Sequence, residues 1–303
     1  MSLAEVEGVR IEHEHLPSGL WRETGRRLLR NPGAIVGFVF VLLFVLIAIF
    51  APLIAPYSPT EQNLSLLADG CCPGPSWAHP MGVDELGRDE LSRVMYGARY
   101  SLVIGVVSVT VGLSIGLLLG AIAGGFGGFA DSIVMRAMDI MLAIPGLLLA
   151  IGIVSLLGPG LVPVMIAVGV ATVPIFSRLL RGAILGQRDT DYVLAAQSIG
   201  VRRRSILTGH ILPNSISPVI VAGTLAMATA IIDVAGLGFL GLGPQDPSTP
   251  EWGTMLTNAN SYLSTAPFLA FFPGLAVVLV VLGFNLIGDG LREALDPKLR
   301  GRL

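Results

Sequence analysis

Long apolar runs constrain this chain more than any other feature of its sequence. Residues 34–55 contain no charged side chain, and at about 1.5 Å per residue a helix of this length crosses a hydrocarbon core of roughly 30 Å. Hydrophobic residues make up 53% of the sequence and charged residues 13%, and the mean hydropathy is +0.76. Five further apolar runs follow, at 100–130, 136–157, 161–180, 215–242 and 266–288. The sequence therefore predicts an all-α integral membrane protein with six transmembrane helices.

The distribution of Lys and Arg predicts the orientation of these helices. If the N-terminus lies inside, only Arg88, Arg93 and Arg99 among the basic residues fall in outer segments, as the positive-inside rule requires. Both termini are then cytoplasmic, and the chain is a multi-pass protein of the plasma membrane. The predicted order is a cytoplasmic tail at 1–32, a first helix at 33–56, an extracytoplasmic loop at 57–98, a core of five helices at 99–291 with a cytoplasmic loop at 188–212, and a cytoplasmic tail at 292–303. An interfacial helix is expected around residues 20–29.

Residues 188–214 form a charged island between two apolar runs. Three consecutive N-cap candidates open it, a helix is expected at 192–199, and Gly200 stands where a helix end needs a left-handed residue. A second short helix is expected at 201–211. Pro213 lacks an N–H and restricts the residue before it, so the second helix is expected to bend or stop there. A solvated connector between two helices would show the same pattern.

The island resembles the "EAA" loop of ABC importer permeases. The similarity rests on Leu194-Ala195-Ala196, on Gly200 after three further residues, and on a Leu-Pro-Asn ending. In that family the loop is a coupling helix that docks into a cleft of a cytosolic ATPase, and small residues let it seat closely. The family usually has Glu where this chain has Leu194, so apolar docking would replace a polar contact there. The resemblance assigns the ATPase contact to Asp191, Leu194, Ala195, Ala196, Ser198, Gly200, Val201, Arg202 and Arg203.

Two further segments resemble dipeptide and oligopeptide permease subunits. They are residues 79–99, before the second apolar run, and residues 285–298, while the Phe-Leu-Gly-Leu-Gly stretch at 239–243 is also similar to that family. The first segment contains a cluster of carboxylates, which a metal site or a catalytic site would also use. An acidic helix start capped by Asp84, with two arginines nearby, explains the cluster as a solvated helix.

A glycine recurs at every fourth position of the second apolar run. These glycines would line one face of a helix, as close packing between membrane helices requires. They are Gly112, Gly116, Gly120, Gly124 and Gly128. The stretch also contains Ser114 in a Gly-x-Ser-x-Gly pattern, which is typical of serine hydrolases. No histidine lies in the central part of an apolar run, so Ser114 is assigned to packing and no catalytic residue is predicted.

Charged and aromatic residues near the apolar runs are further candidates. Asp233 lies about two-thirds of the way along the fifth run, and an intramembrane carboxylate is by default a functional candidate, so it is assigned to the translocation path. A place at the rim of a water-filled cavity, without contact to substrate, is the alternative. Asp139 is expected to pair with Arg136, three residues before it. Trp252 is expected to anchor the outer loop at the membrane interface.

The resemblance implies a transmembrane subunit of a type I ABC importer. Such a subunit pairs with a second, related permease, two cytosolic ATP-binding subunits and an extracytoplasmic substrate-binding protein, and it transports by alternating access. Peptides are the expected substrate, and a nickel chelate, glutathione or another small solute is the alternative. An ion-coupled secondary transporter would need internal repeats or broken helices around midplane charges, and only Asp233 comes near that description.

Several chemical motifs do not occur in the sequence. Its only lysine is Lys298, so it has no P-loop; ATP and Mg²⁺ are expected on the partner subunits, with no cofactor on this chain. It has no Cys/His cluster with zinc spacing and no basic aromatic patch, so neither a metal nor a nucleic acid is expected. Cys71 and Cys72 lie in the loop assigned to the oxidising side, and whether they bond to each other stays open. The chain is therefore predicted to be a transport subunit and not an enzyme.

Overall fold

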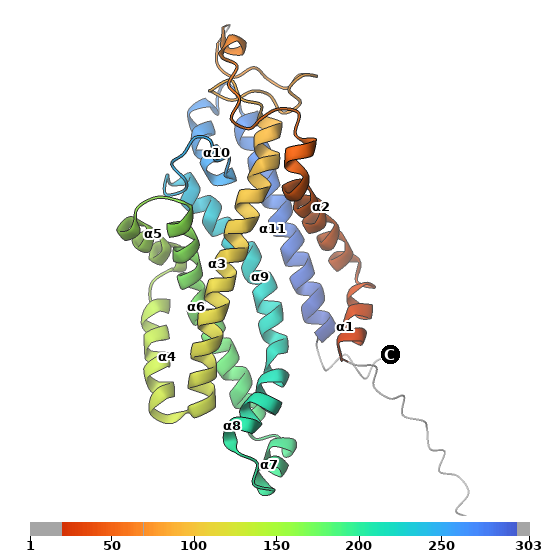
Figure 1. The fold of residues 1–303 in the computed structure, drawn as a ribbon, viewed down its shortest axis with the longest axis vertical. Coiled ribbons are helices and arrows are strands. Elements are labelled where there is room, and N and C mark those ends of the chain that lie inside the picture. Colours follow the sequence, from red (N-terminus) through yellow and green to blue (C-terminus); the bar gives the residue numbers. More distant parts are fainter. Residues whose placement is uncertain (1–19, 69, 296–303) are drawn as a thin grey trace, which may run out of the picture.

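The computed structural model describes residues 20–68 and 70–295, and this part of the chain is helical without a β-strand. The predicted tails before residue 20 and after residue 295 lie outside the described residues. The helix expected around residues 20–29 is present as α1 (Leu20–Leu28). The longest helices run side by side along the long axis of the molecule (Figure 1).

Five helices of the described residues are long and apolar enough to cross a membrane. They are α2 (Pro32–Ile54), α3 (Glu90–Phe126), α6 (Leu161–Arg188), α9 (Leu212–Phe239) and α11 (Phe268–Leu295). The sixth predicted segment is broken, because α4 (Gly128–Leu142) and α5 (Gly146–Leu157) meet at an angle of 90°. The membrane span expected at 136–157 therefore consists of parts of two helices and is not one continuous helix. Pro145 lacks an N–H and disfavours helical geometry at the residue before it, so the chain turns there.

Two helices extend beyond the predicted apolar runs. The Asp89 carboxylate accepts a hydrogen bond from the Ser92 N–H at 2.7 Å, so α3 begins at Glu90 and not at residue 100. α11 continues to Leu295 and does not end at residue 288. Hydropathy marks only the apolar part of a helix, whereas capping and packing set its ends.

α3 packs against α6 through its glycine face. A Cβ atom added to Gly116 would lie 2.6 Å from the Phe176 Cβ, a distance that real Cβ atoms essentially never show. The glycines on this face are Gly112, Gly116, Gly120 and Gly124, and an added Cβ would lie between 1.9 and 3.0 Å from an atom of α6 at each of them. Glycine therefore lets the two backbones approach closely. Gly128 is not part of this face, because the chain turns at Gly127 and Gly128 begins α4.

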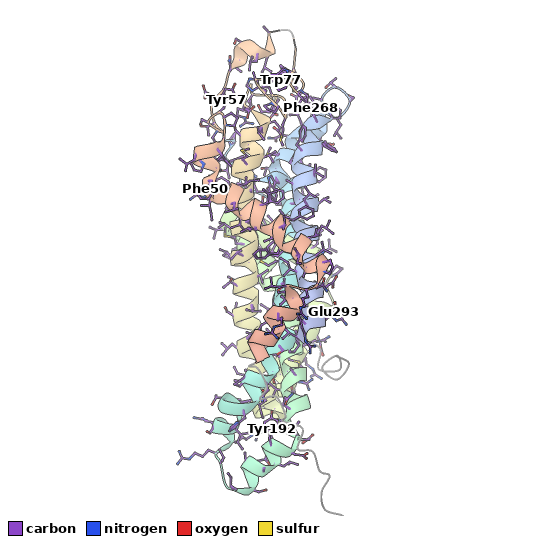
Figure 2. All side chains as sticks on the ribbon, turned by 90° about the vertical axis from the view of Figure 1, so that its right-hand side faces the viewer. Phe50, Tyr57, Trp77, Tyr192, Phe268 and Glu293 are labelled. Atoms are coloured by element: carbon purple, nitrogen blue, oxygen red, sulfur yellow. A yellow bond between two sulfur atoms is a disulfide. The ribbon has the colours of Figure 1, made fainter. Side chains whose placement is uncertain are left out.

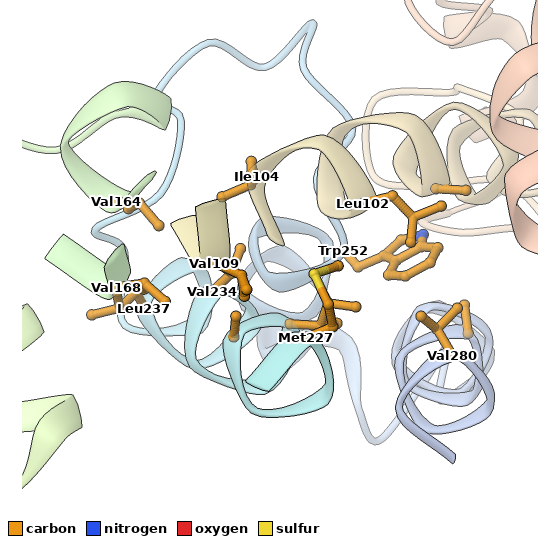
Figure 3. Close-up of a cluster of buried hydrophobic side chains, with 14 of the residues drawn as sticks. Leu102, Ile104, Val109, Val164, Val168, Met227, Val234, Leu237, Trp252 and Val280 are labelled. Atoms are coloured by element: carbon orange, nitrogen blue, oxygen red, sulfur yellow. The ribbon is translucent and has the colours of Figure 1, made fainter. Parts of the chain in front are cut away.

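The largest apolar cluster of the described residues lies between α3, α6, α9, α11 and a short helix, α10 (Trp252–Ala259), with residues of α2 and α5 at its sides, as Figure 3 shows in part. Trp252 is fully buried in this cluster, where its ring packs edge-on against Phe44 and its indole N–H donates to the Val94 carbonyl oxygen at 3.1 Å. The prediction that it anchors the loop at the membrane interface is therefore wrong. Gly97 leaves room for the ring inside the bundle, because an added Cβ there would lie 2.6 Å from it.

The charged segment before α3 is buried. Arg88 is 2% exposed; its Nε donates to Asp84 Oδ2 at 2.6 Å and its Nη1 donates to the Pro247 carbonyl oxygen at 2.7 Å. Arg93 Nε lies 3.3 Å from the same Asp84 oxygen. The prediction of a solvated helix capped by Asp84 is wrong on both points, because Asp89 is the cap and Asp84 holds two buried arginines. The acceptor on Pro247 comes from a distant loop, which a local charge pattern does not reveal.

The loop between α2 and α3 contains a disulfide bond between adjacent residues. Cys71 and Cys72 are bonded to each other, which answers the question that the sequence leaves open. Cys72 is buried and packs in a small cluster with Ala259, Ala266 and Leu269. The bond therefore lies where the loop covers the ends of α10 and α11.

Candidate functional site

The charged island folds into a short helix followed by a glycine corner. The helix is α7 (Asp191–Ser198), and Gly200 after it has a left-handed φ of +78°. The Gly200 N–H donates to the Gln197 carbonyl oxygen at 3.0 Å, and the Val201 N–H donates to the Ala196 carbonyl oxygen at 3.1 Å. These two bonds form a Schellman motif, which satisfies carbonyl groups at the helix end. The predicted helix and its left-handed glycine are confirmed.

The outer face of α7 and its corner is exposed and largely apolar. Leu194 is 48% exposed and Ile199 is 81% exposed, whereas Val193 is 1% exposed and packs into an apolar cluster. Ala195, beside Leu194, is also exposed and adds only a methyl group to the surface. An exposed apolar helix face of this kind fits the groove of a partner protein.

Two arginines attach this region to the end of α3. Arg188 Nη2 donates to the Gly125 carbonyl oxygen at 2.7 Å, and Arg203 Nη2 donates to the carbonyl oxygens of Gly125 and Phe126 at 3.2 Å each. These acceptors lie at the C-terminus of α3, where a helix attracts cations. The two arginines flank α7, so they join both sides of this helix to the C-terminus of α3. The sequence assigns Arg203 to this site but does not single out Arg188.

A cleft of about 490 Å³ lies between α7 and the bundle. Its walls come from the ends of α3 and α6, from α7 and from the turns before α9, and Arg188 and Arg203 line it. Figure 2 shows this end of the molecule, marked by Tyr192, at the far end from Tyr57 and Trp77. Val193, Leu194 and Gln197 of α7 line this cleft, whereas Ala195 and Ser198 are exposed and do not line it.

The second half of the island does not stop at its proline. α8 (Arg203–Ile206) and a π-helical turn, η2 (Leu207–Ile211), continue into α9 as one long helix. The helix therefore does not stop at Pro213, one of the two outcomes expected there. A π-helical turn shifts the hydrogen-bond pattern by one residue, and here it directly precedes the proline that cannot donate an N–H.

Asp233 is half-buried on α9. It makes no hydrogen bond or ion pair with any residue at 20–68 or 70–295. Gly236, one helical turn further along α9, lies next to Leu147 at the start of α5. The carboxylate is thus unpaired within the described chain, on a helix without another charged residue and close to the bend between α4 and α5. Its assignment to the translocation path remains a prediction.

Two ion pairs connect α4 with α6. Asp139 pairs with Arg178, so the predicted pair between Asp139 and Arg136 is wrong. Asp131 pairs with Arg181, whose Nη2 lies 2.7 Å from Asp131 Oδ2. The chain turns at Gly127 and α4 runs back beside the bundle (Figure 1), so its acidic residues find partners on another helix.

Glu251 is a buried carboxylate that sequence reasoning misses. It caps α10, because Oε1 accepts from the Gly253 N–H at 2.8 Å and Oε2 accepts from the Thr254 N–H at 2.9 Å. Burial raises the pKa of the Glu251 carboxyl, although these two hydrogen bonds oppose the shift. The one signal in the sequence is the position of Glu251 directly before α10. Hydropathy does not reveal this short helix, so the signal is easily missed.

Replacing Glu251 by alanine is expected to lower the free energy of unfolding by about 1–2 kcal/mol, because two buried N–H groups lose their acceptor. Thermal unfolding of the purified chain in one detergent measures the change. Asp246→Ala is the matched control, since Asp246 makes similar local hydrogen bonds to Ser248 on an exposed turn and little change is expected there. Equal losses in the two variants would contradict the role of Glu251 as a buried cap.

The arrangement of helices is similar to that of a solved ABC transporter. A structure of the MetNI methionine ABC transporter in inward-facing conformations aligns with a TM-score of 0.54 and 21% identity, over 67% of this chain and 96% of that chain. At this identity the similarity concerns the fold alone. With five continuous membrane helices, one bent segment and an exposed helix between α6 and α9, the chain has the permease fold of a type I ABC importer.

Sequence comparisons identify the family. The profile described as "Binding-protein-dependent transport system inner membrane component" matches residues 116–301, and that of the "N-terminal TM domain of oligopeptide transport permease C" matches residues 19–68. The chain belongs to the family of binding-protein-dependent transport system inner membrane components. It is therefore a transport component of the inner membrane.

Three curated relatives are 47% identical to this chain. The dipeptide transport system permease protein DppC of Alkalihalophilus pseudofirmus aligns over 289 residues, 95% of this chain and 93% of that protein. The di/tripeptide transport system permease protein DppC of Pseudomonas aeruginosa aligns over 94% of both chains. The glutathione transport system permease protein GsiD of Escherichia coli aligns over 93% of this chain and 91% of that protein.

Proposed function

We propose that this chain is the permease subunit of an ATP-driven importer that moves di- or oligopeptides across the cytoplasmic membrane. The observation that carries the proposal is the exposed helix α7 with its glycine corner, attached to α3 by Arg188 and Arg203. A helix presented in this way gives a cytosolic ATPase a contact through which it moves the bundle. The relatives named for dipeptides and di/tripeptides support peptide as the substrate.

The proposed contact with the ATPase is the outer face of α7 and the residues of its corner. Closure of two ATPase subunits on ATP and Mg²⁺ pushes this element, and the helices joined to it tilt as rigid bodies between inward-facing and outward-facing states. The chain itself hydrolyses no ATP, because its only lysine, Lys298, is not part of a P-loop. A second, related permease and an extracytoplasmic binding protein complete the proposed assembly.

We place α7 and both termini on the cytoplasmic side. α1 and the end of α11 lie toward the same end of the bundle as α7 (Figure 1), and Asn31 Nδ2 donates to Glu293 Oε2 at 2.6 Å between α2 and α11. Most of the arginines belong to segments at this end of the bundle, whereas Arg88, Arg93 and Arg99 belong to the opposite half. The positive-inside rule supports this orientation.

The unpaired carboxylate of Asp233 is our candidate for the translocation path. A carboxylate in an apolar bundle provides an acceptor for the ammonium group of a peptide. Relatives named for glutathione, at the same 47% identity as those named for dipeptides, make glutathione the second candidate substrate. Both candidates carry an ammonium group, so Asp233 does not discriminate between them.

Co-purification from the native host tests this function. The tagged chain, extracted in mild detergent, is expected to recover a P-loop ATPase, a sister permease and a binding protein, which mass spectrometry identifies. ATP hydrolysis by the preparation, reconstituted in vesicles with the binding protein, is expected to rise when peptides are added. Glutathione added in place of peptides distinguishes the two candidate substrates.

Recovery of the chain without any ATPase under gentle conditions would contradict the coupling role of α7. The island would then be a connector, and an ion-coupled secondary transporter would become the better proposal. Stimulation by glutathione but not by dipeptides would keep the importer and change its substrate.

A further inference from the structure

A groove between α2 and α3 carries a single charged residue. It has a volume of about 440 Å³ and is lined by aliphatic side chains of both helices and by Arg99. We propose that this groove binds an anionic phospholipid, with the lipid phosphate on the Arg99 guanidinium and one acyl chain along the groove. The proposal does not depend on the proposed transport function, because it concerns the outside of two membrane helices.

The walls of the groove expose apolar surface that no other part of the described chain covers. Ile49 on α2 is 62% exposed, and Val103 and Val106 on α3 are 48% and 51% exposed. Apart from Arg99, every lining side chain is Val, Leu, Ile or Ala. A narrow apolar groove between two membrane helices fits a single acyl chain, because hydrocarbon fills it without leaving a polar group unsatisfied.

Arg99 supplies the charge that selects the headgroup. It is exposed, and it has no ion pair or hydrogen bond with the residues that the structure describes. Arg93, less than two turns earlier on α3, is buried and has acceptors, with its Nε 3.3 Å from Asp84 and its Nη1 3.2 Å from the Pro59 carbonyl oxygen. A guanidinium matches a phosphate group with two parallel hydrogen bonds, so a phosphate would supply the acceptor that Arg99 lacks in the described chain.

The groove is oriented as a phospholipid requires. α2 ends and α3 begins at the same end of the bundle, where the Tyr57 N–H donates to Ser92 Oγ at 3.1 Å. Arg99 lies toward this end, and Val107 lies about 12 Å deeper along α3 at about 1.5 Å per residue. The groove thus covers most of the roughly 15 Å that the acyl chains of one leaflet occupy. Its charge lies toward the membrane surface and its apolar part toward the bilayer centre.

Native mass spectrometry of the full chain, with the subunits that co-purify, tests the site. The sample receives phosphatidylglycerol or phosphatidylcholine with the same acyl chains, and the wild-type chain is expected to retain phosphatidylglycerol preferentially. Arg99→Gln is expected to reduce this retention about tenfold, because a charge-assisted hydrogen-bond pair is lost. Val106→Trp fills the groove without changing its charge and is expected to reduce retention as well.

Arg136→Gln, which removes another exposed arginine from the other half of the bundle, is the matched control and is expected to change nothing.

Four results would overturn the proposal. The first is equal retention of the two lipids, and the second is unchanged retention in both the Arg99→Gln and Val106→Trp variants. The third is competition by free inorganic phosphate, which would show that no acyl chain is needed. The fourth is a cross-link between a Val103→Cys variant and a sister subunit in native membranes, which would show that protein covers the groove. A failure to observe ATP-driven transport by the wild-type complex would count against the proposed function. The lipid measurement does not depend on transport, so the two proposals can fail separately.

Discussion

Ala195→Trp is expected to reduce peptide uptake at least about tenfold while leaving the fold of the chain unchanged. Ala195 is exposed on the outer face of α7, next to Leu194, so a larger side chain meets no neighbour within the chain. In the proposed complex the same side chain would keep the partner's groove from closing over the helix, and a loss of about 1.4 kcal/mol in docking is a factor of ten. Uptake of labelled peptide by reconstituted vesicles measures the effect, with ATP hydrolysis recorded in the same sample.

Ala195→Ser is the conservative control and is expected to transport normally. Gly200→Trp tests the corner independently: an added Cβ at Gly200 meets nothing within 4 Å, but any L-residue is strained at its φ of +78°. Gly209→Ala, on the helical turn nearby and also with open space around its Cβ, is expected to transport normally. Normal uptake by both Ala195→Trp and Gly200→Trp would refute the docking role of α7.

Gly116→Leu is expected to separate α3 from α6 and to leave little folded protein. An added Cβ at Gly116 would lie 2.6 Å from the Phe176 Cβ and 2.8 Å from the Val173 carbonyl oxygen. The second neighbour is backbone, so the strain cannot be relieved by a change of rotamer. Overpacking commonly costs about 1–3 kcal/mol, and we expect the upper end of this range or more. The yield of monodisperse protein and its unfolding temperature in detergent measure the loss.

Gly182→Leu is the control for this prediction. Gly182 lies on α6, the partner helix, but an added Cβ there meets no atom within 4 Å. The substitution adds the same side chain to the same helix pair without forcing the backbones apart. If both variants fold equally well, the glycine face of α3 is not what holds the two helices together.

The sequence predicted well those features that depend on neighbouring residues. The uncharged run at 34–55 indicates a membrane helix, and α2 occupies that run. Gly200 was predicted to be left-handed because a helix end needs such a residue, and its Schellman hydrogen bonds join residues close in the chain. Spacing alone also predicted the glycine face of α3, since every fourth residue of a helix returns to the same side.

Motifs that depend on structural context were less informative. The Gly-x-Ser-x-Gly pattern around Ser114 lies in the middle of α3, whereas a nucleophile of that class sits on a sharp strand-to-helix turn. Proline positions alone do not give the path of the chain, which turns at Pro145 and continues through Pro213. A π-helical turn directly precedes Pro213, and Pro145 is preceded by no such turn. The number and positions of prolines do not reveal this turn.

By itself, the sequence determined that this chain crosses a membrane as helices and carries an exposed helix with a glycine corner, because hydropathy and helix capping act over a few residues. Only the tertiary structure decided which charges are buried and what they bind. The buried Arg88 finds an acceptor on Pro247 and the buried Arg93 finds one on Pro59, whereas the exposed Arg99 finds none in the described chain. The physical reason is that a buried charge needs a partner close in space, and folding brings that partner from a distant part of the chain.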